Sequence, residues 1–208
     1  MDFYFNFDSD FSKNGFQTNY SYQLDLEKEG LRPVPVIHDC YGNEIQTYID
    51  RGYEMLAIGS GELKYAGLDD LRHIVDPLYR RGIKVHFLGC TEFRKLAYLP
   101  VYSADSSTCS KAGRSGRIFW NPLKSGHYRL DEIVLDDNIP KSVIKYHIND
   151  YKFRDQLEQY LYEDLGLSIE DLMNEDWAIN RALVNIHCFV LLEELINKKH
   201  EEQGFETG

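Results

Sequence analysis

Residues 55–89 read MLAIGSGELKYAGLDDLRHIVDPLYRRGIKVHFLG and form the clearest structural pattern in the chain. The two ends of this stretch, Met55–Ile58 and Lys84–Leu88, are short apolar runs that predict buried strands. Between them, Leu68–Arg81 has the spacing of an amphipathic helix, and Gly82 follows where a helix commonly ends in a left-handed residue. The stretch therefore predicts a strand–helix–strand unit with parallel strands.

The same alternation extends over residues 1–122, which we expect to form an α/β domain. Further strands are expected at Phe3–Phe7, Val34–Ile37, Pro100–Ala104 and Arg117–Trp120. Further helices are expected at Asn19–Glu29, Glu44–Arg51 and Thr91–Ala97, with Gly30 and Gly52 at helix ends. Residues 123–208 predict an acidic, mainly helical segment that packs on this α/β domain or on a partner. It contains a loop or short strand at Ile133–Lys141 and helices at Lys141–Leu165 and Trp177–Lys199, with a capping box at Ser168–Asp171.

The composition is that of a globular protein, with 43% hydrophobic and 27% charged residues in a chain of 208. No signal peptide and no apolar stretch long enough to span a bilayer is found, so no membrane partner and a cytoplasmic location are expected. The four cysteines lack any C-x-x-C pair, which disfavours a disulfide framework and a cysteine-rich zinc site. We expect no metal and no cofactor.

Polar or glycine residues follow each of the first five predicted strands. They are Asp8, His38, Gly59–Glu62, Gly89 and Asp105. The carboxyl ends of parallel strands form the ligand face of β/α folds, so these residues are expected to converge on one pocket. Taken singly, each also has an ordinary explanation, since Asp8 fits a helix cap or turn and His38 fits a core histidine.

The segment from Asp105 to Gly116, DSSTCSKAGRSG, places one carboxylate ahead of a basic loop with two glycines. Glycine allows a ligand close to the backbone and cations suit phosphate oxygens, so phosphate binding is predicted for Lys111, Gly113, Arg114 and Arg117. The net charge of −11 does not oppose this, because residues 123–208 carry 18 acids against 9 Lys and Arg. An ordinary polar turn with a solvated Asp105 is the alternative.

Three segments together resemble the tRNA-guanine transglycosylase family. Asp105 through Gly116 resembles the family's nucleophile segment, Phe7-Asp8-Ser9 its base-recognition segment, and Ile58–Glu62 its glycine-rich base-binding loop. Pro33–His38, Lys84–His86 and Tyr102–Ser107 are similar to phage and bacterial relatives that act on 7-deazaguanine bases. The resemblance covers residues 1–122 and implies a partial or modified TIM (β/α) barrel that lacks its first strands and carries a C-terminal helical appendage.

The resemblance also implies roles for single residues. Asp105 becomes the nucleophile, and Asp8, the second catalytic residue, binds the amide edge of the purine. Base binding falls to His38, Gly59, Ser60, Gly61, His86 and Gly89, with His38 standing where the family has a Gln and His86 or Gly89 lying over or beside the base. The family's zinc motif is missing here. The implied partners are a purine or deazapurine base, DNA or tRNA, and a second copy or second subunit that completes the barrel.

Three functions are compatible with these patterns. The first is a base-exchange glycosyltransferase acting on guanine in DNA or tRNA through a covalent intermediate on Asp105. The second is a catalytically impaired protein that binds a purine or nucleotide or regulates a partner, which the missing first strands would explain. The third is a nucleoside hydrolase in which the same carboxylate acts and water completes the reaction.

Overall fold

The computed structural model describes residues 3–10, 12, 15–122, 130–136 and 145–206. The chain forms two compact units. Unit 1 comprises residues 1–106 with residues 199–208, and unit 2 comprises residues 107–198. This division differs from the boundary predicted at residue 122, because residues 107–122 belong to unit 2.

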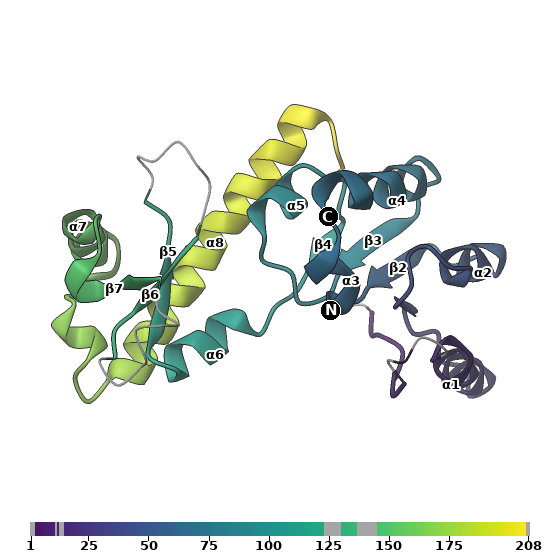
Figure 1. Cartoon of the computed structure of the whole chain (residues 1–208), viewed down its shortest axis with the longest axis horizontal. Coiled ribbons are helices and arrows are strands. Elements are labelled where there is room, and N and C mark those ends of the chain that lie inside the picture. Colours follow the sequence, from purple (N-terminus) through teal and green to yellow (C-terminus); the bar gives the residue numbers. More distant parts are fainter. Residues whose placement is uncertain (1–2, 11, 13–14, 123–129, 137–144, 207–208) are drawn as a thin grey trace. The chain divides into compact units, whose positions relative to one another are not determined.

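Unit 1 is built on a parallel sheet whose strands keep their order along the chain. Its strands are β1 (Val36–Ile37), β2 (Met55–Ile58), β3 (Lys84–Phe87) and β4 (Ser103–Ala104), in the order β1-β2-β3-β4. Its helices are α1 (Phe16–Lys28), α2 (Glu44–Asp50), α3 (Ser60–Tyr65), α4 (Leu68–Arg80) and α5 (Phe93–Ala97). All three strand pairs are parallel, as the alternating pattern predicts (Figure 1).

The first predicted strand, Phe3–Phe7, extends this sheet by one isolated parallel bridge between Phe5 and Val34. Asn6 donates its backbone N–H to Val34 O at 2.9 Å, and Val34 donates to Tyr4 O at 2.7 Å. The segment is therefore placed beside β1 as predicted, but it makes a single bridge and not a strand of five residues.

The two faces of the parallel sheet differ in their neighbours. One face carries Leu56, Ile58, Val85 and Phe87, all fully buried, and Figure 1 shows α4 running beside β3. The helix contributes Leu71, Val75 and Leu78 at the i, i+4, i+7 spacing of an amphipathic helix. The other face carries a smaller cluster formed by Val34, Val36 and Ala57, packed against Phe3 and Phe5. The strand–helix–strand pattern of residues 55–89 is thus confirmed.

The glycines that follow three of the helices have the predicted left-handed conformation. Gly30, Gly52 and Gly82 have φ values of 79°, 73° and 73°. A side chain at such φ clashes with the neighbouring carbonyl, so glycine is favoured at these helix ends.

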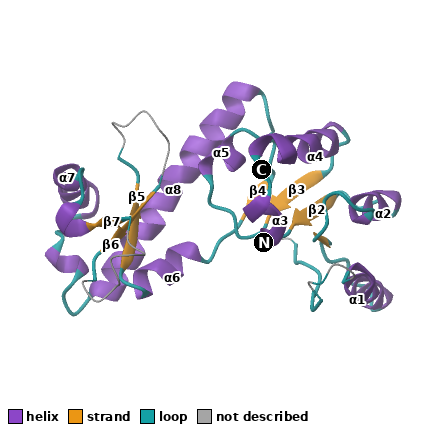
Figure 2. Cartoon of the chain, viewed as in Figure 1, coloured by secondary structure: helices purple, strands orange, loops and turns teal. Residues whose placement is uncertain are grey.

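Unit 2 contains a second sheet beside three helices. Its described elements are α6 (Thr108–Arg114), β5 (Arg117–Trp120), β6 (Asp131–Val134), β7 (Tyr146–His147), the 3-10 turns Ile148–Asp150 and Glu170–Leu172, α7 (Arg154–Leu165) and residues 177–198 of α8 (Trp177–Gln203), whose last residues belong to unit 1. β5 pairs with β6 antiparallel and β6 with β7 parallel, and Figure 2 shows these strands as a sheet of their own. The apolar core joins residues of the sheet, α7 and α8, among them Ile118, Ile133, Leu161 and Val184.

Four expectations about local structure are corrected. Arg117–Trp120 is a strand, but it belongs to the sheet of unit 2 and is not a sixth parallel strand. Residues 60–65 and 108–114 form α3 and α6, where glycines suggested turns and loops. Helix α7 begins at Arg154, because residues 146–150 form β7 and a 3-10 turn. The remainder of that predicted helix, residues 141–144, lies outside the described residues, as do residues 137–141 of the predicted loop.

The capping box predicted at Ser168–Asp171 is confirmed. Ser168 donates its backbone N–H and its hydroxyl to Asp171 Oδ2, at 2.8 and 2.7 Å, while Asp171 N–H donates back to Ser168 Oγ at 3.3 Å. These bonds lower the pKa of Asp171, with the hydroxyl of Ser168 as the main cause. The reciprocal pair satisfies backbone donors at the start of the 3-10 turn.

Candidate active site

Asp8 lies at the carboxyl end of the Phe5 bridge and pairs with the histidine that follows β1. Asp8 Oδ2 lies 2.9 Å from His38 Nε2, while Asp8 Oδ1 accepts a 3.0 Å hydrogen bond from the amide of Asn6. The Asp8 side chain is 8% exposed and the His38 side chain 23% exposed. The structure therefore joins two predicted site residues that are 30 positions apart in the chain.

Glu44, the first residue of α2, fixes the backbone beneath this pair. Its Oε2 accepts the backbone N–H of His38 at 2.7 Å, and the residue is 5% exposed. Burial raises the pKa of Glu44, and the N–H groups of His38 and Asp39 oppose that shift. Sequence reasoning placed Glu44 only as a helix start; an acid in the first helical turn, shortly after a candidate site residue, was the available signal.

We expect Asp8→Asn to lower the pKa of His38. The hydrogen bond to Asp8 is the main cause that raises this pKa above its ordinary value, while burial acts against it. A histidine with a raised pKa stabilises the fold fully below the unfolded pKa of about 6.5, and the effect is lost as pH rises through the folded pKa. The variant should therefore lose more stability at about pH 5.5 than at about pH 8.5.

NMR titration of the histidine rings and denaturant unfolding at both pH values test this prediction. His73, which is exposed on α4, serves as the reference within each sample. An unchanged His38 pKa in the variant, or a stability loss that grows with pH, contradicts the assigned pairing.

Gly59 links the His38 pair to the next strand. A Cβ on Gly59 would lie 3.1 Å from Ile37 O and 3.2 Å from His38 Nδ1, which is closer than side chains normally pack. Glycine is thus favoured here, because the Ile37 carbonyl oxygen and the His38 ring both lie close to this position. Ser60 and Gly61 follow in the first turn of α3, and Gly61 has open space around it, so packing does not explain its lack of a side chain.

Asp105 follows β4 and is held by the loop after β3. Its Oδ1 accepts the backbone N–H of Gly89 at 2.7 Å, and its own N–H donates to Phe87 O at 3.2 Å. Gly89 has a φ of 68°, and a Cβ there would lie 3.3 Å from Ser60 Cβ. The Asp105 side chain is 56% exposed. The carboxylate is therefore oriented by the backbone and accessible from outside.

His86 lies on β3 directly below Asp105. Its Nδ1 lies 2.9 Å from Ser103 Oγ, and the residue is 3% exposed. Its Nε2 makes no hydrogen bond within the described residues and lies 3.7 Å from Asp105 Oδ1. Burial lowers the pKa of His86, and the Asp105 carboxylate opposes that shift, so the ring is neutral near pH 7.

The surroundings of His86 bear on its predicted position over or beside the base. Phe5 packs against the His86 ring with centroids 4.7 Å apart, and Phe3 lies at 6.0 Å. The buried ring thus has an aromatic neighbour from this chain, and its Nε2 edge is the part directed at Asp105. The sequence analysis did not single out Ser103 or Phe5. Side chains two residues apart in a strand lie on the same face, and Ser103 is two residues before Asp105 while Phe5 is two residues after Phe3.

These contacts form a continuous line across the carboxyl ends of the parallel strands. It runs from Asp8 to His38 and Gly59, continues from Ser60 to Gly89, and ends at Asp105 and His86. Seven of the predicted site residues are thereby brought together in unit 1. Chemically, the line offers two carboxylates, one histidine with a raised pKa and one neutral buried histidine.

The residues predicted to bind phosphate belong to unit 2. Lys111 and Arg114 are exposed on α6, and Arg117 on β5 pairs with Glu132 at 3.2 Å. Gly113 is buried on α6, and a Cβ there would lie 3.5 Å from Arg181 Cβ and 3.6 Å from Asn185 Nδ2 of α8, which are ordinary packing distances. Phosphate binding by these four residues stays a prediction.

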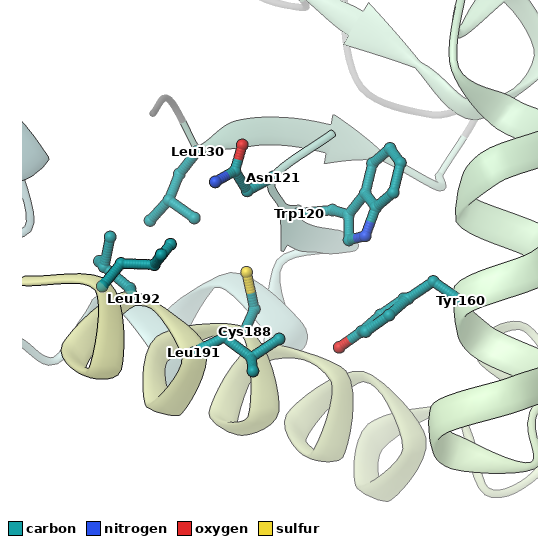
Figure 3. A pocket seen from close by; sticks show the side chains of 8 residues that line it. Trp120, Asn121, Leu130, Tyr160, Cys188, Leu191 and Leu192 are labelled. Carbon is teal, nitrogen blue, oxygen red and sulfur yellow. The ribbon is translucent and has the colours of Figure 1, made fainter. Parts of the chain in front are cut away.

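Two further hollows lie outside this line of residues. An apolar cavity in unit 2 of about 30 Å³, room for about two waters, is lined by Trp120, Asn121, Leu130, Tyr160, Cys188, Leu191, Leu192 and Leu195 (Figure 3). Burial raises the pKa of the Cys188 thiol to about 12, so the thiolate that would act as a nucleophile is scarce at neutral pH. A hollow of about 320 Å³ near the start of β1 and β2 contains Arg51, which is paired with Glu27.

Comparisons with known proteins place no constraint on this assignment. No protein-family model, curated protein or solved structure matches the chain. Among the described residues, no cluster of three or more His, Cys, Asp or Glu side chains is arranged to hold a metal ion. None of the helices described in the structure is both long and apolar enough to cross a membrane. The candidate site therefore rests on its own geometry.

Proposed function

We propose that this chain is a base-exchange glycosyltransferase that acts on guanine nucleosides of DNA or tRNA. The observation that carries the proposal is the line of contacts from Asp8 to Asp105 across the carboxyl ends of the parallel strands. The strand order supports a partial (β/α) barrel, because strands that follow one another around an arc are typical of barrels, whose active sites lie at this end.

Asp105 is the nucleophile in this proposal. Its Oδ1 is held by Gly89 N–H, which leaves Oδ2 to attack the anomeric carbon of the nucleoside. A C–O bond forms as the glycosidic C–N bond breaks, and the bonding electrons leave with the base nitrogen, which takes up a proton. An incoming base then attacks the same carbon through its nitrogen, loses its proton and returns the carboxylate. Two displacements retain the configuration, as in retaining glycosidases.

The Asp8–His38 pair is the proposed recognition element for the base. A carboxylate accepts hydrogen bonds from the N–H groups at the amide edge of guanine, and the Asp8 carboxylate is positioned by the 2.9 Å contact between its Oδ2 and His38 Nε2. Gly59 donates its own backbone N–H to Ile37 O at 2.9 Å, so the donors proposed for the same base are the backbone N–H groups of Ser60 and Gly61 in the first turn of α3. His86 Nε2 adds a buried polar atom beside the nucleophile.

A nucleoside hydrolase is the second candidate, and the exposure of Asp105 favours it. With 56% of the side chain exposed, water can reach the carbon that the carboxylate would hold. Hydrolysis would use the same first displacement and would replace the incoming base by water. The two reactions therefore differ only in their products.

The test is to incubate the purified chain with labelled guanine and, in separate samples, bulk tRNA and bulk DNA. Label entering one polymer supports base exchange and identifies the nucleic acid. Abasic sites without label indicate the hydrolase. Retention of labelled guanine by the protein, with both polymers unchanged, contradicts both enzymes and leaves a purine-binding protein.

A further inference from the structure

Helix α8 carries an exposed apolar stripe in unit 2. The side chains of Ile179, Leu183, Ile186 and Val190 are 70%, 42%, 54% and 45% exposed. They are spaced by four, three and four residues, which keeps them on one face of the helix. This spacing is that of the contact seam between two packed helices.

The stripe is a second apolar face, separate from the one that α8 buries in its own unit. Val184, Asn185, Cys188 and Leu192 are at most 5% exposed and face the interior of unit 2. A surface helix ordinarily presents polar side chains opposite its buried face. Large apolar side chains in a row on that face indicate an interaction surface.

Acidic residues continue the same spacing at both ends of the stripe. Asp176 lies three residues before Ile179, and Glu193 lies three residues after Val190; both are exposed. In a helix, Asp176 and Glu193 are about 26 Å apart along the axis. Glu175 and Glu194 add a second acid at each end.

Among the residues of α8 between positions 177 and 192, none is an exposed cation. Arg181 is the one charged residue between positions 177 and 192 of the sequence. It is 8% exposed, donates to Leu172 O at 2.7 Å, and places its guanidinium 4.6 Å from the Trp177 ring. The stripe is therefore apolar in the middle and negative at its ends.

We infer that this stripe binds an amphipathic helix of a partner protein that has apolar residues at the same spacing and Lys or Arg at both ends. The apolar side chains would supply the buried contact, and the basic ends would pair with Asp176 and Glu193. A second copy of this chain fits less well. Antiparallel pairing about the Val184–Asn185 midpoint would set Asp176 of one copy against Glu193 of the other, with like charges in contact.

Two synthetic helical peptides test the inference, with the full chain as the protein. Both carry the same apolar stripe, and one has Lys at each end where the other has Glu. The Lys peptide is expected to bind with a Kd of about 10 μM at low salt and the Glu peptide at least about tenfold more weakly. NMR shift changes caused by the Lys peptide should fall on residues 176–193.

Ile186→Asp should weaken binding of the Lys peptide by about tenfold or more, because it places a carboxylate in the apolar contact. The matched control is Tyr162→Asp on α7, whose side chain is 77% exposed and should not change the Kd. Equal binding of the two peptides, no binding at about 1 mM, or shift changes elsewhere would overturn the inference. The inference would also be overturned if the unsubstituted chain formed a dimer and Ile186→Asp converted that dimer to a monomer. None of these outcomes depends on glycosyl transfer, so the proposed enzyme is tested separately.

Discussion

Asp105→Asn is expected to reduce base exchange on the order of 10⁴-fold or more, because an amide oxygen is a far weaker nucleophile than a carboxylate. The fold and the binding of free base should be retained. The side chain is 56% exposed, and the amide oxygen of Asn can still accept the N–H of Gly89. Activity is measured as label incorporated per unit time, and base binding by equilibrium dialysis.

Glu54→Gln is the matched control for this variant. Glu54 is an exposed carboxylate that precedes β2, at the end of the parallel sheet opposite to Asp105. Its removal changes the net charge by the same amount and should leave exchange unchanged. An Asp105→Asn protein with activity within about tenfold of the original would contradict the assignment of the nucleophile.

Asn185→Ala is expected to destabilise unit 2 by about 3 kcal/mol. Asn185 is fully buried on α8, and its Oδ1 accepts the backbone N–H of Phe119 at 2.7 Å. Its Nδ2 donates to Cys109 O at 3.2 Å and lies within 3.4 Å of Arg117 O. One amide side chain thus joins α8 to α6 and β5. Its removal leaves a buried backbone donor without a partner and opens a small cavity.

Tryptophan fluorescence during urea unfolding measures this loss, because both tryptophans of the chain, Trp120 and Trp177, lie in unit 2. Asn197→Ala is the control, since Asn197 is exposed on the same helix and gains the same helix propensity. Equal stabilities of the two variants would show that the buried amide contributes nothing beyond its helical position.

The parallel part of the fold could be predicted from sequence because it depends on local patterns. The buried runs at Met55–Ile58 and Lys84–Phe87, and the glycines after the helices, each report on a few neighbouring residues. The partner of a strand is a nonlocal property. Arg117–Trp120 reads as a strand in either sheet, and its pairing with Asp131–Val134 leaves no local signal.

The part of the candidate site that could be predicted consists of residues that directly follow the parallel strands. Asp8, His38, Gly59, Gly89 and Asp105 come together because parallel strands present their carboxyl ends on one side. Glu44 and Ser103 were not predicted, because their roles come from contacts to a backbone N–H and a ring nitrogen. The basic segment after Asp105 forms a helix and a strand of unit 2, and Gly113 lies within that helix.

Asp105 is expected to carry the nucleoside covalently, and mass spectrometry of the denatured protein detects that bond. The chain is incubated with tRNA or DNA, denatured, and digested with nuclease and protease. We expect a nucleotide-derived adduct on the peptide that contains Asp105, attached at that carboxylate. An adduct on another residue, or base exchange that proceeds without any adduct, would contradict it.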